Sequence, residues 1–170
     1  MAPRSSRIVS AALVIGTIAA VTEMVPVFPI QAALGVSPRL VLQSIASGVM
    51  GKAAYSGGAA TVLLGIAFHL LISVVAALLY VMAAERWAWL RRHPWLAGIA
   101  YGTVVFAVMR WIVVPLSAVA YRQSTDWGMF AISLTVHILG FGLPVALLDR
   151  WLARANARRE ADLAPTAAVS

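Results

Sequence analysis

Four long runs of apolar residues, each bounded by charged or turn-forming residues, dominate the pattern along the 170-residue chain. They cover residues 8–25, 59–84, 95–116 and 128–148. Because about 20 apolar residues in a helix cross the hydrocarbon core of a bilayer, each run is long enough to be a transmembrane helix. The pattern therefore predicts an all-α polytopic membrane protein with about four transmembrane helices, formed by residues 1–154.

The first apolar run has two interpretations. It is entered after two arginines, and Pro26 and Pro29 are expected to end it. A basic start before an apolar run is also typical of a secretory signal, which would be cleaved. We favour a retained helix, because no clean small-x-small cleavage site follows Ala20 and because Ala12, Gly16 and Ala20 form a small-xxx-small stripe suited to helix packing.

The connector between the first two runs has a helical period of its own. In residues 38–54 the apolar side chains fall on one helical face, and Arg39, Gln43 and Ser47 fall on another. This pattern predicts a short interfacial helix with its polar face in water. A helix packed over the mouth of the bundle is the alternative.

Two further segments carry simple predictions. Gly98 and Gly102 have the GxxxG spacing that lets a second helix backbone approach closely. In an accessory membrane component, this face or the interfacial helix would hold a partner protein or a second copy of the chain. The Ala-rich, polar segment 155–170 is predicted to be a disordered cytoplasmic tail.

Composition supports the membrane assignment. With 62% apolar and only 11% charged residues, the chain has too little polar surface to coat a water-soluble globule, so lipid is the expected surrounding. The formal charge of +7 does not indicate nucleic acid as a partner, because most of the arginines flank the apolar runs. Cysteine is absent, which excludes a disulfide framework and a thiolate nucleophile.

The arginines and lysine also predict the orientation. One side of the membrane receives nine of the 13 basic residues, the other receives three, and Arg110 lies inside a run. Because basic loops stay in the cytoplasm, both chain ends and the loop between the second and third runs are expected there. The predicted location is a bacterial-type inner membrane.

Four ionisable residues lie within or at the end of apolar runs: Glu23, His69, Arg110 and His137. An unpaired charge at the bilayer centre costs at least about 2.5 kcal/mol, so such residues are candidates for function. Counted at about 1.5 Å per residue from the outer ends of their runs, the two histidines share a level near the midplane. All four are expected to converge on the outer half of one bundle.

Three interpretations of this cluster stay open. The histidines can fix helix register through hydrogen bonds, which is the structural interpretation that we favour from sequence. The cluster can form a proton or small-solute path, since histidine titrates near neutrality. His69 and His137 can also be the axial ligands of a b-type haem, with Arg110 facing a propionate. The chain contains no G-x-S-x-G, H-E-x-x-H or Walker motif, so no enzyme activity is predicted.

A resemblance to a known group supports the same fold. The segments LQSIASG at 42–48, GGA at 57–59 followed by His69, and VVPLS at 113–117 resemble an uncharacterised family of small bacterial inner-membrane proteins that is distantly similar to the YagU-like proteins. The likeness covers about half of the chain. It implies a four-helix inner-membrane protein and brings no mechanism.

Overall fold

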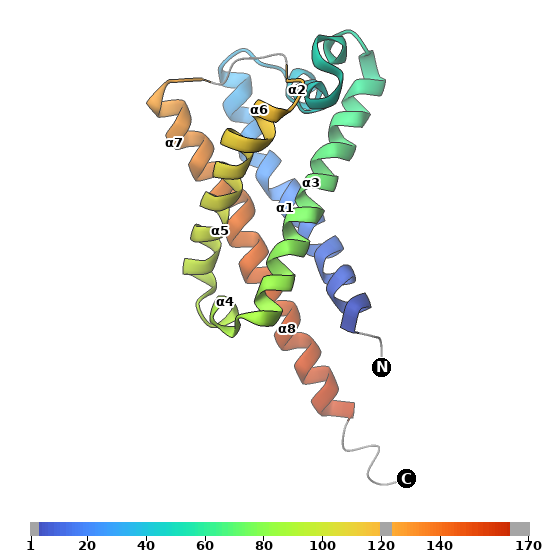
Figure 1. Ribbon diagram of the computed structural model, residues 1–170, viewed down its shortest axis with the longest axis vertical. Coiled ribbons are helices and arrows are strands. Elements are labelled where there is room, and N and C mark those ends of the chain that lie inside the picture. Colours follow the sequence, from blue (N-terminus) through green and yellow to red (C-terminus); the bar gives the residue numbers. More distant parts are fainter. Residues whose placement is uncertain (1–3, 120–123, 164–170) are drawn as a thin grey trace.

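The computed structural model describes residues 4–119 and 124–163, and this part of the chain contains helices and no strand (Figure 1). The elements are α1 (Arg4–Ala33), α2 (Pro38–Met50), η1 (Gly51–Tyr55), α3 (Gly58–Arg86), α4 (Ala88–Arg92), α5 (Pro94–Val108), η2 (Met109–Val113), α6 (Val114–Leu116), α7 (Trp127–Val136), η3 (His137–Gly142) and α8 (Leu143–Leu163). Here η1 is a 3₁₀-helix, whereas η2 and η3 are π-helical turns.

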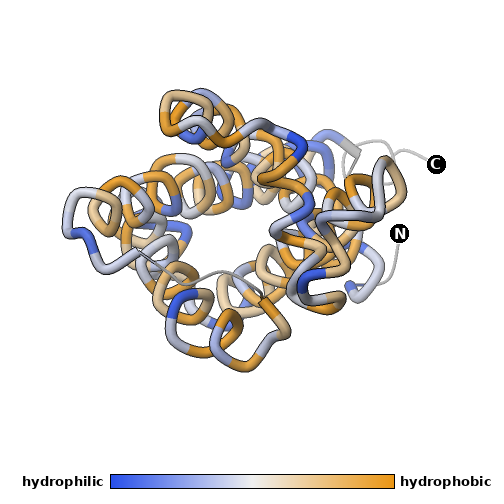
Figure 2. The backbone as a smooth tube through the Cα atoms, turned by 90° about the horizontal axis from the view of Figure 1, so that it is seen from above, coloured by the Kyte–Doolittle hydropathy of each residue, from blue (hydrophilic) through white to orange (hydrophobic). Residues whose placement is uncertain are grey.

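Four helical rods run the length of the molecule. They are α1, α3, the rod α5–η2–α6 and the rod α7–η3–α8, and each is long and apolar enough to cross a membrane. Large apolar side chains such as Leu63, Leu79 and Val104 are exposed on their outer surfaces, and apolar segments occur on every rod (Figure 2). Because such a surface suits hydrocarbon rather than water, the chain has the architecture of an all-α multi-pass membrane protein.

The two ends of the bundle differ. The N- and C-terminal segments lie together at one end, which we call the termini end, and α2 and η1 lie at the opposite end, which we call the connector end (Figure 1). An even number of crossings brings both chain ends to the same side.

The first helix continues past its two prolines, so the expected end at Pro26 is wrong. Both Pro26 and Pro29 lie inside α1, which ends at Ala33. A proline removes one backbone N–H and displaces the carbonyl four residues earlier, but a membrane helix tolerates this where neighbouring groups satisfy the freed backbone. The helix stops instead at Gly35, whose φ of 80° lies in the left-handed region that glycine adopts readily.

Both π-helical turns are followed closely by a proline. Pro115 follows η2 and Pro144 follows η3. The rings of these prolines displace the carbonyls of Trp111 and Gly140, which lie within the two π turns. The carbonyl of Gly140 is not left unpaired, because the Thr22 hydroxyl of α1 donates a hydrogen bond to it at 2.6 Å.

The small-residue stripe of the first helix packs against α3. Ala12 and Ala20 are almost fully buried, and a Cβ atom added to Gly16 would lie 2.5 Å from the Cα atom of Val74. The two backbones therefore touch at Gly16, which only glycine permits.

Gly98 and Gly102 are used within the chain. A Cβ atom on Gly102 would lie 2.6 Å from the His137 carbonyl oxygen, and one on Gly98 would lie 2.9 Å from the Cα atom of Leu143. The GxxxG face of α5 thus packs against η3 and α8 of the same molecule. The expectation that it can hold a partner protein is wrong, because its surface is already covered.

The connector helix α2 packs on α3, and two of its polar side chains face the protein. Ser37 caps the helix by accepting a hydrogen bond from the Leu40 N–H. Gln43 and Ser47 are buried, and the Gln43 amide donates to the Thr61 hydroxyl at 3.0 Å, whereas Val49 is 67% exposed. The prediction of a water-facing polar side is therefore wrong for Gln43, which bonds to α3, and for Ser47, whose hydroxyl donates to the Ser44 carbonyl of α2 itself, whereas Arg39 is exposed as expected. The packing favours a helix lying over the mouth of the bundle.

The last helix is longer than expected. Residues 155–163 belong to α8, whose side chains include the helix formers alanine, arginine and glutamate. An ion pair between Arg7 and Glu160 attaches this segment to α1. The predicted disordered tail is therefore wrong for residues 155–163, and its remainder, 164–170, lies outside the described residues.

Candidate functional site

Three of the four intramembrane ionisable residues meet in the bundle. Glu23 of α1 is 9% exposed. Its Oε1 atom lies 3.5 Å from the Nε2 atom of His137, at the start of η3, and its Oε2 atom lies 4.0 Å from the Nε2 atom of His69 in α3. One carboxyl group is thus shared by two imidazoles that come from different helices. We call these three residues the Glu23 cluster.

A glycine brings α1 and η3 close enough for this contact. A Cβ atom on Gly140 would lie 2.9 Å from the Cα atom of Glu23. Gly140 is three residues after His137, on the same side of the rod. Together with the hydrogen bond from Thr22, this close approach fixes the level at which Glu23 meets His137.

Backbone carbonyls assign the tautomers of both histidines. The His69 Nε2 atom lies 3.0 Å from the Ala20 carbonyl oxygen, and the His137 Nδ1 atom lies 2.8 Å from the Ser133 carbonyl oxygen. A carbonyl can only accept, so each of these nitrogens carries a proton. In neutral His137 the Nε2 atom then holds a lone pair that faces Glu23.

This arrangement forms a site for one shared proton. The proton can reside on Glu23, which then donates to the Nε2 atom of His137, or it can reside on His137, which then pairs with the carboxylate. The pair carries no net charge in either form, whereas loss of the proton leaves one negative charge. The 3.5 Å separation is slightly longer than a normal hydrogen bond, so direct transfer needs a small side-chain movement.

Arg110 does not join the cluster, which corrects the prediction of four converging residues. Its guanidinium donates to the Ser124 carbonyl oxygen at 2.9 Å and lies 5.2 Å from the centre of the Phe130 ring. Among the described residues, no ion pair connects Arg110 with Glu23. Counting residues from the end of a span predicts depth only, and the direction in which Arg110 points depends on packing.

The haem interpretation does not fit this geometry. Two axial imidazoles must bind an iron atom placed between their nitrogens. Here the Glu23 carboxyl lies between the facing Nε2 atoms of His69 and His137, with one oxygen directed to each. The Nε2 atom of His69 is also engaged by the Ala20 carbonyl, so neither imidazole presents a free nitrogen to an iron atom placed between them.

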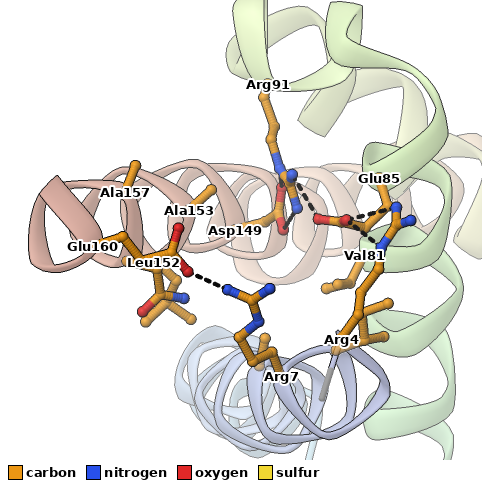
Figure 3. A pocket seen from close by; sticks show the side chains of 13 residues that line it. Arg4, Arg7, Val81, Glu85, Arg91, Asp149, Leu152, Ala153, Ala157 and Glu160 are labelled. Atoms are coloured by element: carbon orange, nitrogen blue, oxygen red, sulfur yellow. Dashed lines mark hydrogen bonds and ion pairs between the residues drawn. The ribbon is translucent and has the colours of Figure 1, made fainter. Parts of the chain in front are cut away.

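A second polar region lies at the termini end, where a cavity of about 230 Å³ opens between α1, α3, α4 and α8 (Figure 3). Its charged lining consists of three basic and three acidic residues: Arg4, Arg7, Arg91, Glu85, Asp149 and Glu160. The positive and negative charges balance, so the cavity offers polar atoms and no net charge.

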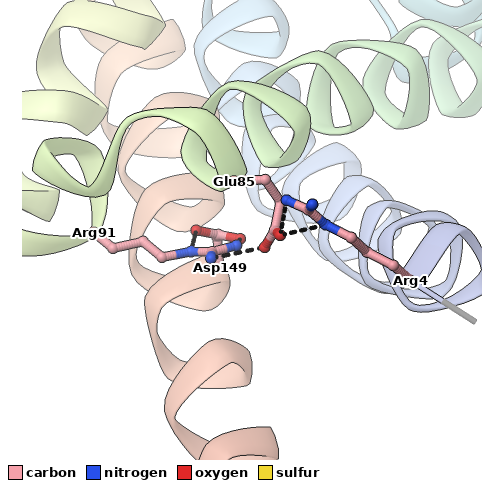
Figure 4. Close-up of polar contacts among 4 residues, drawn as sticks. All are labelled: Arg4, Glu85, Arg91 and Asp149. Atoms are coloured by element: carbon pink, nitrogen blue, oxygen red, sulfur yellow. Dashed lines mark hydrogen bonds and ion pairs between the residues drawn. The ribbon is translucent and has the colours of Figure 1, made fainter. Parts of the chain in front are cut away.

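Four of these residues form an ion network that connects α1, α3 and α8 with the short helix α4 at this end (Figure 4). The guanidinium of Arg91 donates to both carboxylate oxygens of Asp149, at 2.8 and 3.0 Å. Its Nη1 atom also lies 2.8 Å from the Oε1 atom of Glu85. Arg4 lies 2.9 Å from Glu85. The hydrogen bonds to Asp149 and Glu85 raise the pKa of Arg91 above its usual value. We call this set the Arg91 network.

Sequence reasoning missed the Arg91 network. Asp149 directly follows the fourth apolar run and is not singled out by the sequence pattern, yet it lies in α8 and is 2% exposed. A signal was present: Phe141, Val145 and Asp149 follow one another at intervals of four, and all three are buried. A carboxyl group on the apolar face of a helix needs a cation as partner. The arginines of the loop between the second and third apolar runs, which include Arg91, lie at the same end of the bundle and were the available partners.

A packed apolar core separates the Glu23 cluster from the Arg91 network. On α1, Ala19 and Ile15 follow Glu23 toward the termini end, and on α3 Ala77 lies between His69 and Glu85. On the last rod, Phe141 and Val145 lie between His137 and Asp149. These apolar residues fill most of the level between the two regions, and the polar groups described there are the buried side chains of Ser73 and Tyr80 on α3 and the Tyr101 hydroxyl on α5.

No protein-family model, curated protein or solved structure matches the chain. The resemblance to the YagU-like group therefore stays a prediction, and the function is inferred from the geometry of the Glu23 cluster.

Proposed function

We propose that the chain is a multi-pass protein of a bacterial-type inner membrane that binds and releases a proton at the Glu23 cluster, as part of proton or small-solute transport. The observation that carries this proposal is the placement of the Glu23 carboxyl between two histidines inside the bundle. The arginine-rich termini end is assigned to the cytoplasm, because basic residues are retained there.

Access to the cluster is proposed from the connector end. Thr61, Gly65 and His69 are spaced by four residues, so they share one face of α3. At the top of this face the buried pair Gln43–Thr61 supplies polar atoms, and Ser47 is buried beside it on α2. A proton or water molecule from the connector end would meet these hydrogen-bonding groups first. Beyond them α2 covers the face, because a Cβ atom on Gly65 would overlap the Leu42 carbonyl, so access to His69 needs α2 to move away from α3.

Proton release and solute movement are expected to be coupled by charge. A bare carboxylate at membrane depth costs at least about 2.5 kcal/mol, so Glu23 can lose the shared proton only when water or a cation replaces it. The apolar core and the Arg91 network close the termini end in this conformation. Transport then needs a second conformation in which that end opens, as in other alternating-access proteins.

A structural role is the second candidate, and one contact favours it. The hydrogen bond between the His69 Nε2 atom and the Ala20 carbonyl connects α3 to α1, as expected for a histidine that fixes helix register. In that case removal of the Glu23 carboxylate would alter stability without any change in flux.

The deciding experiment is proton flux into reconstituted vesicles that contain a pH-sensitive dye. Glu23→Gln keeps the size and hydrogen-bonding capacity of the side chain but cannot bind or release a proton. We expect it to abolish the flux seen with the unchanged protein, while the unfolding temperature in detergent stays similar. His93→Gln, at an exposed position outside the spans, is the matched control and should retain full flux. Equal flux in Glu23→Gln and the unchanged protein would refute the proposal.

A further inference from the structure

The inference concerns an apolar groove on the outer surface, away from both polar regions. It lies between residues 71–83 of α3 and 97–108 of α5, with Trp87, Trp89 and Leu90 at the termini end, and has a volume of about 690 Å³. We call it the α3–α5 groove. It exists because α3 packs on α1 whereas α5 packs on η3 and α8, so the two helices stand apart (Figure 1).

The walls of the groove offer hydrocarbon contacts only. Leu71, Val75 and Leu79 of α3 face Val104 and Val108 of α5 across it. Two lining residues carry hydroxyls: that of Tyr101 donates to the Ala76 carbonyl at 2.5 Å, and that of Tyr80 is buried away from the groove surface. A molecule that fills the groove must therefore present an apolar chain.

The end of the groove near the termini has a different chemistry. Trp87 and Trp89 line it, and aromatic rings of this kind lie at the headgroup level of a bilayer. Arg86 and Arg92 flank these tryptophans and are exposed. Whereas Arg91 is held in its network, no acidic residue of the described chain forms an ion pair with Arg86 or Arg92. Two exposed cations thus flank, along the chain, the tryptophans that line this end of the groove, although neither arginine lines the groove itself.

We propose that the α3–α5 groove binds one phospholipid with an anionic headgroup, whose acyl chain lies between α3 and α5 and whose phosphate contacts Arg86 and Arg92. The length accommodates this occupant: residues 71–83 of α3 span about 18 Å and the opposite wall, residues 97–113, spans about 24 Å at 1.5 Å per residue, against about 15 Å for one leaflet of a bilayer core. The proposal is independent of proton transport, because it uses no residue of the Glu23 cluster.

A helix of a second copy is a poorer fit for the groove. Helices approach closely in membranes through glycine and other small residues. Gly16, Gly98 and Gly102 are all covered by other helices of the same molecule. No glycine lines the described groove, and although four alanines do (Ala76, Ala83, Ala97 and Ala100), leucine and valine side chains such as Leu71, Leu79 and Val104 project beside them. A flexible acyl chain adapts to such walls, whereas a rigid helix does not.

The test is native mass spectrometry of the full chain, delipidated in detergent and offered equal amounts of phosphatidylglycerol and phosphatidylcholine. We expect one phosphatidylglycerol molecule to stay bound at a collision energy in the mass spectrometer that removes phosphatidylcholine. Arg86→Gln combined with Arg92→Gln should weaken phosphatidylglycerol binding roughly 25-fold, since each cation near an anionic headgroup contributes roughly fivefold. Arg154→Gln with Arg158→Gln removes the same charge from an exposed part of α8 and should have little effect.

A second pair of variants tests the groove itself. Val104→Trp fills the groove and should lower phosphatidylglycerol binding at least tenfold, whereas Ile99→Trp places the same side chain elsewhere on the exposed surface of α5. Equal unfolding temperatures would confirm that both variants fold. Equal retention of the two lipids, or unchanged binding in Val104→Trp, would overturn the proposal. A dimer that Val104→Trp dissociates would overturn it too, because the occupant would then be a second copy.

Discussion

Removal of the Asp149 carboxylate is the sharpest test of what closes the termini end. In the pair that it forms with Arg91, the aspartate side chain is 3% exposed and the arginine side chain 27% exposed. Breaking a buried ion pair by removing one partner costs about 3–5 kcal/mol, because a charge stays behind without compensation. In a variant without the Asp149 carboxylate, Arg91 still has one anionic partner, because Glu85 lies 2.8 Å away. We therefore expect Asp149→Ala to destabilise the fold by about 3 kcal/mol, the lower end of that range.

The chain contains a matched control in the Arg7–Glu160 pair. Its side chains are 46% and 45% exposed, and exposed ion pairs contribute only about 0–1 kcal/mol. Glu160→Ala is thus expected to change stability by less than about 1 kcal/mol, although it too removes one carboxylate from the same cavity.

Reversible unfolding in mixed micelles of mild detergent and dodecyl sulfate measures both variants. Replacing the pair together, as Arg91→Met with Asp149→Leu, should cost less than Asp149→Ala alone, because no buried charge is left unpaired. If Asp149→Ala and Glu160→Ala have the same small effect, the Arg91 network does not hold the rods together, and the description of a closed termini end is wrong.

Two further predictions concern helix packing. Gly102→Ala places a methyl group 2.6 Å from the His137 carbonyl oxygen and should destabilise the protein by about 1–3 kcal/mol; Gly48→Ala meets its nearest atom at 3.9 Å and is the control, with micelle unfolding as the measurement. Thr22→Val removes the donor to the Gly140 carbonyl and should cost about 1 kcal/mol in the same assay. No loss of stability in Thr22→Val would show that the carbonyl freed by Pro144 needs no partner.

The spans could be predicted because length and hydropathy decide them. A run such as 59–84 is too apolar for water, and the matching helix α3 covers Gly58–Arg86. The same reasoning fails at element ends. Neither Pro26 nor Ala155 ends a helix, since in both places neighbouring rods provide the contacts that let the helix continue.

The candidate site was predictable in part, for a geometric reason. Depth along a helix follows from residue counting, which placed His69 and His137 at one level. Rotation about the helix axis does not follow, because it depends on which helices are neighbours and on irregular turns. Glu23 therefore meets both histidines, whereas Arg110 is directed toward Ser124 and Phe130.

The π turn η3 links the two polar regions of the molecule. His137 and Asp149 are 12 residues apart, and in an uninterrupted α-helix, at about 100° per residue, they would point about 120° away from each other. A π turn accommodates one surplus residue, which reduces this angle to about 20° and lets the same rod present both side chains to one side. Deletion of a single residue within η3 would leave the two side chains 11 residues apart in a regular helix, where the angle is again about 20°. Such a shortened rod would still direct His137 toward Glu23 and Asp149 toward Arg91, whereas a regular helix of the present length would lose one of the two contacts.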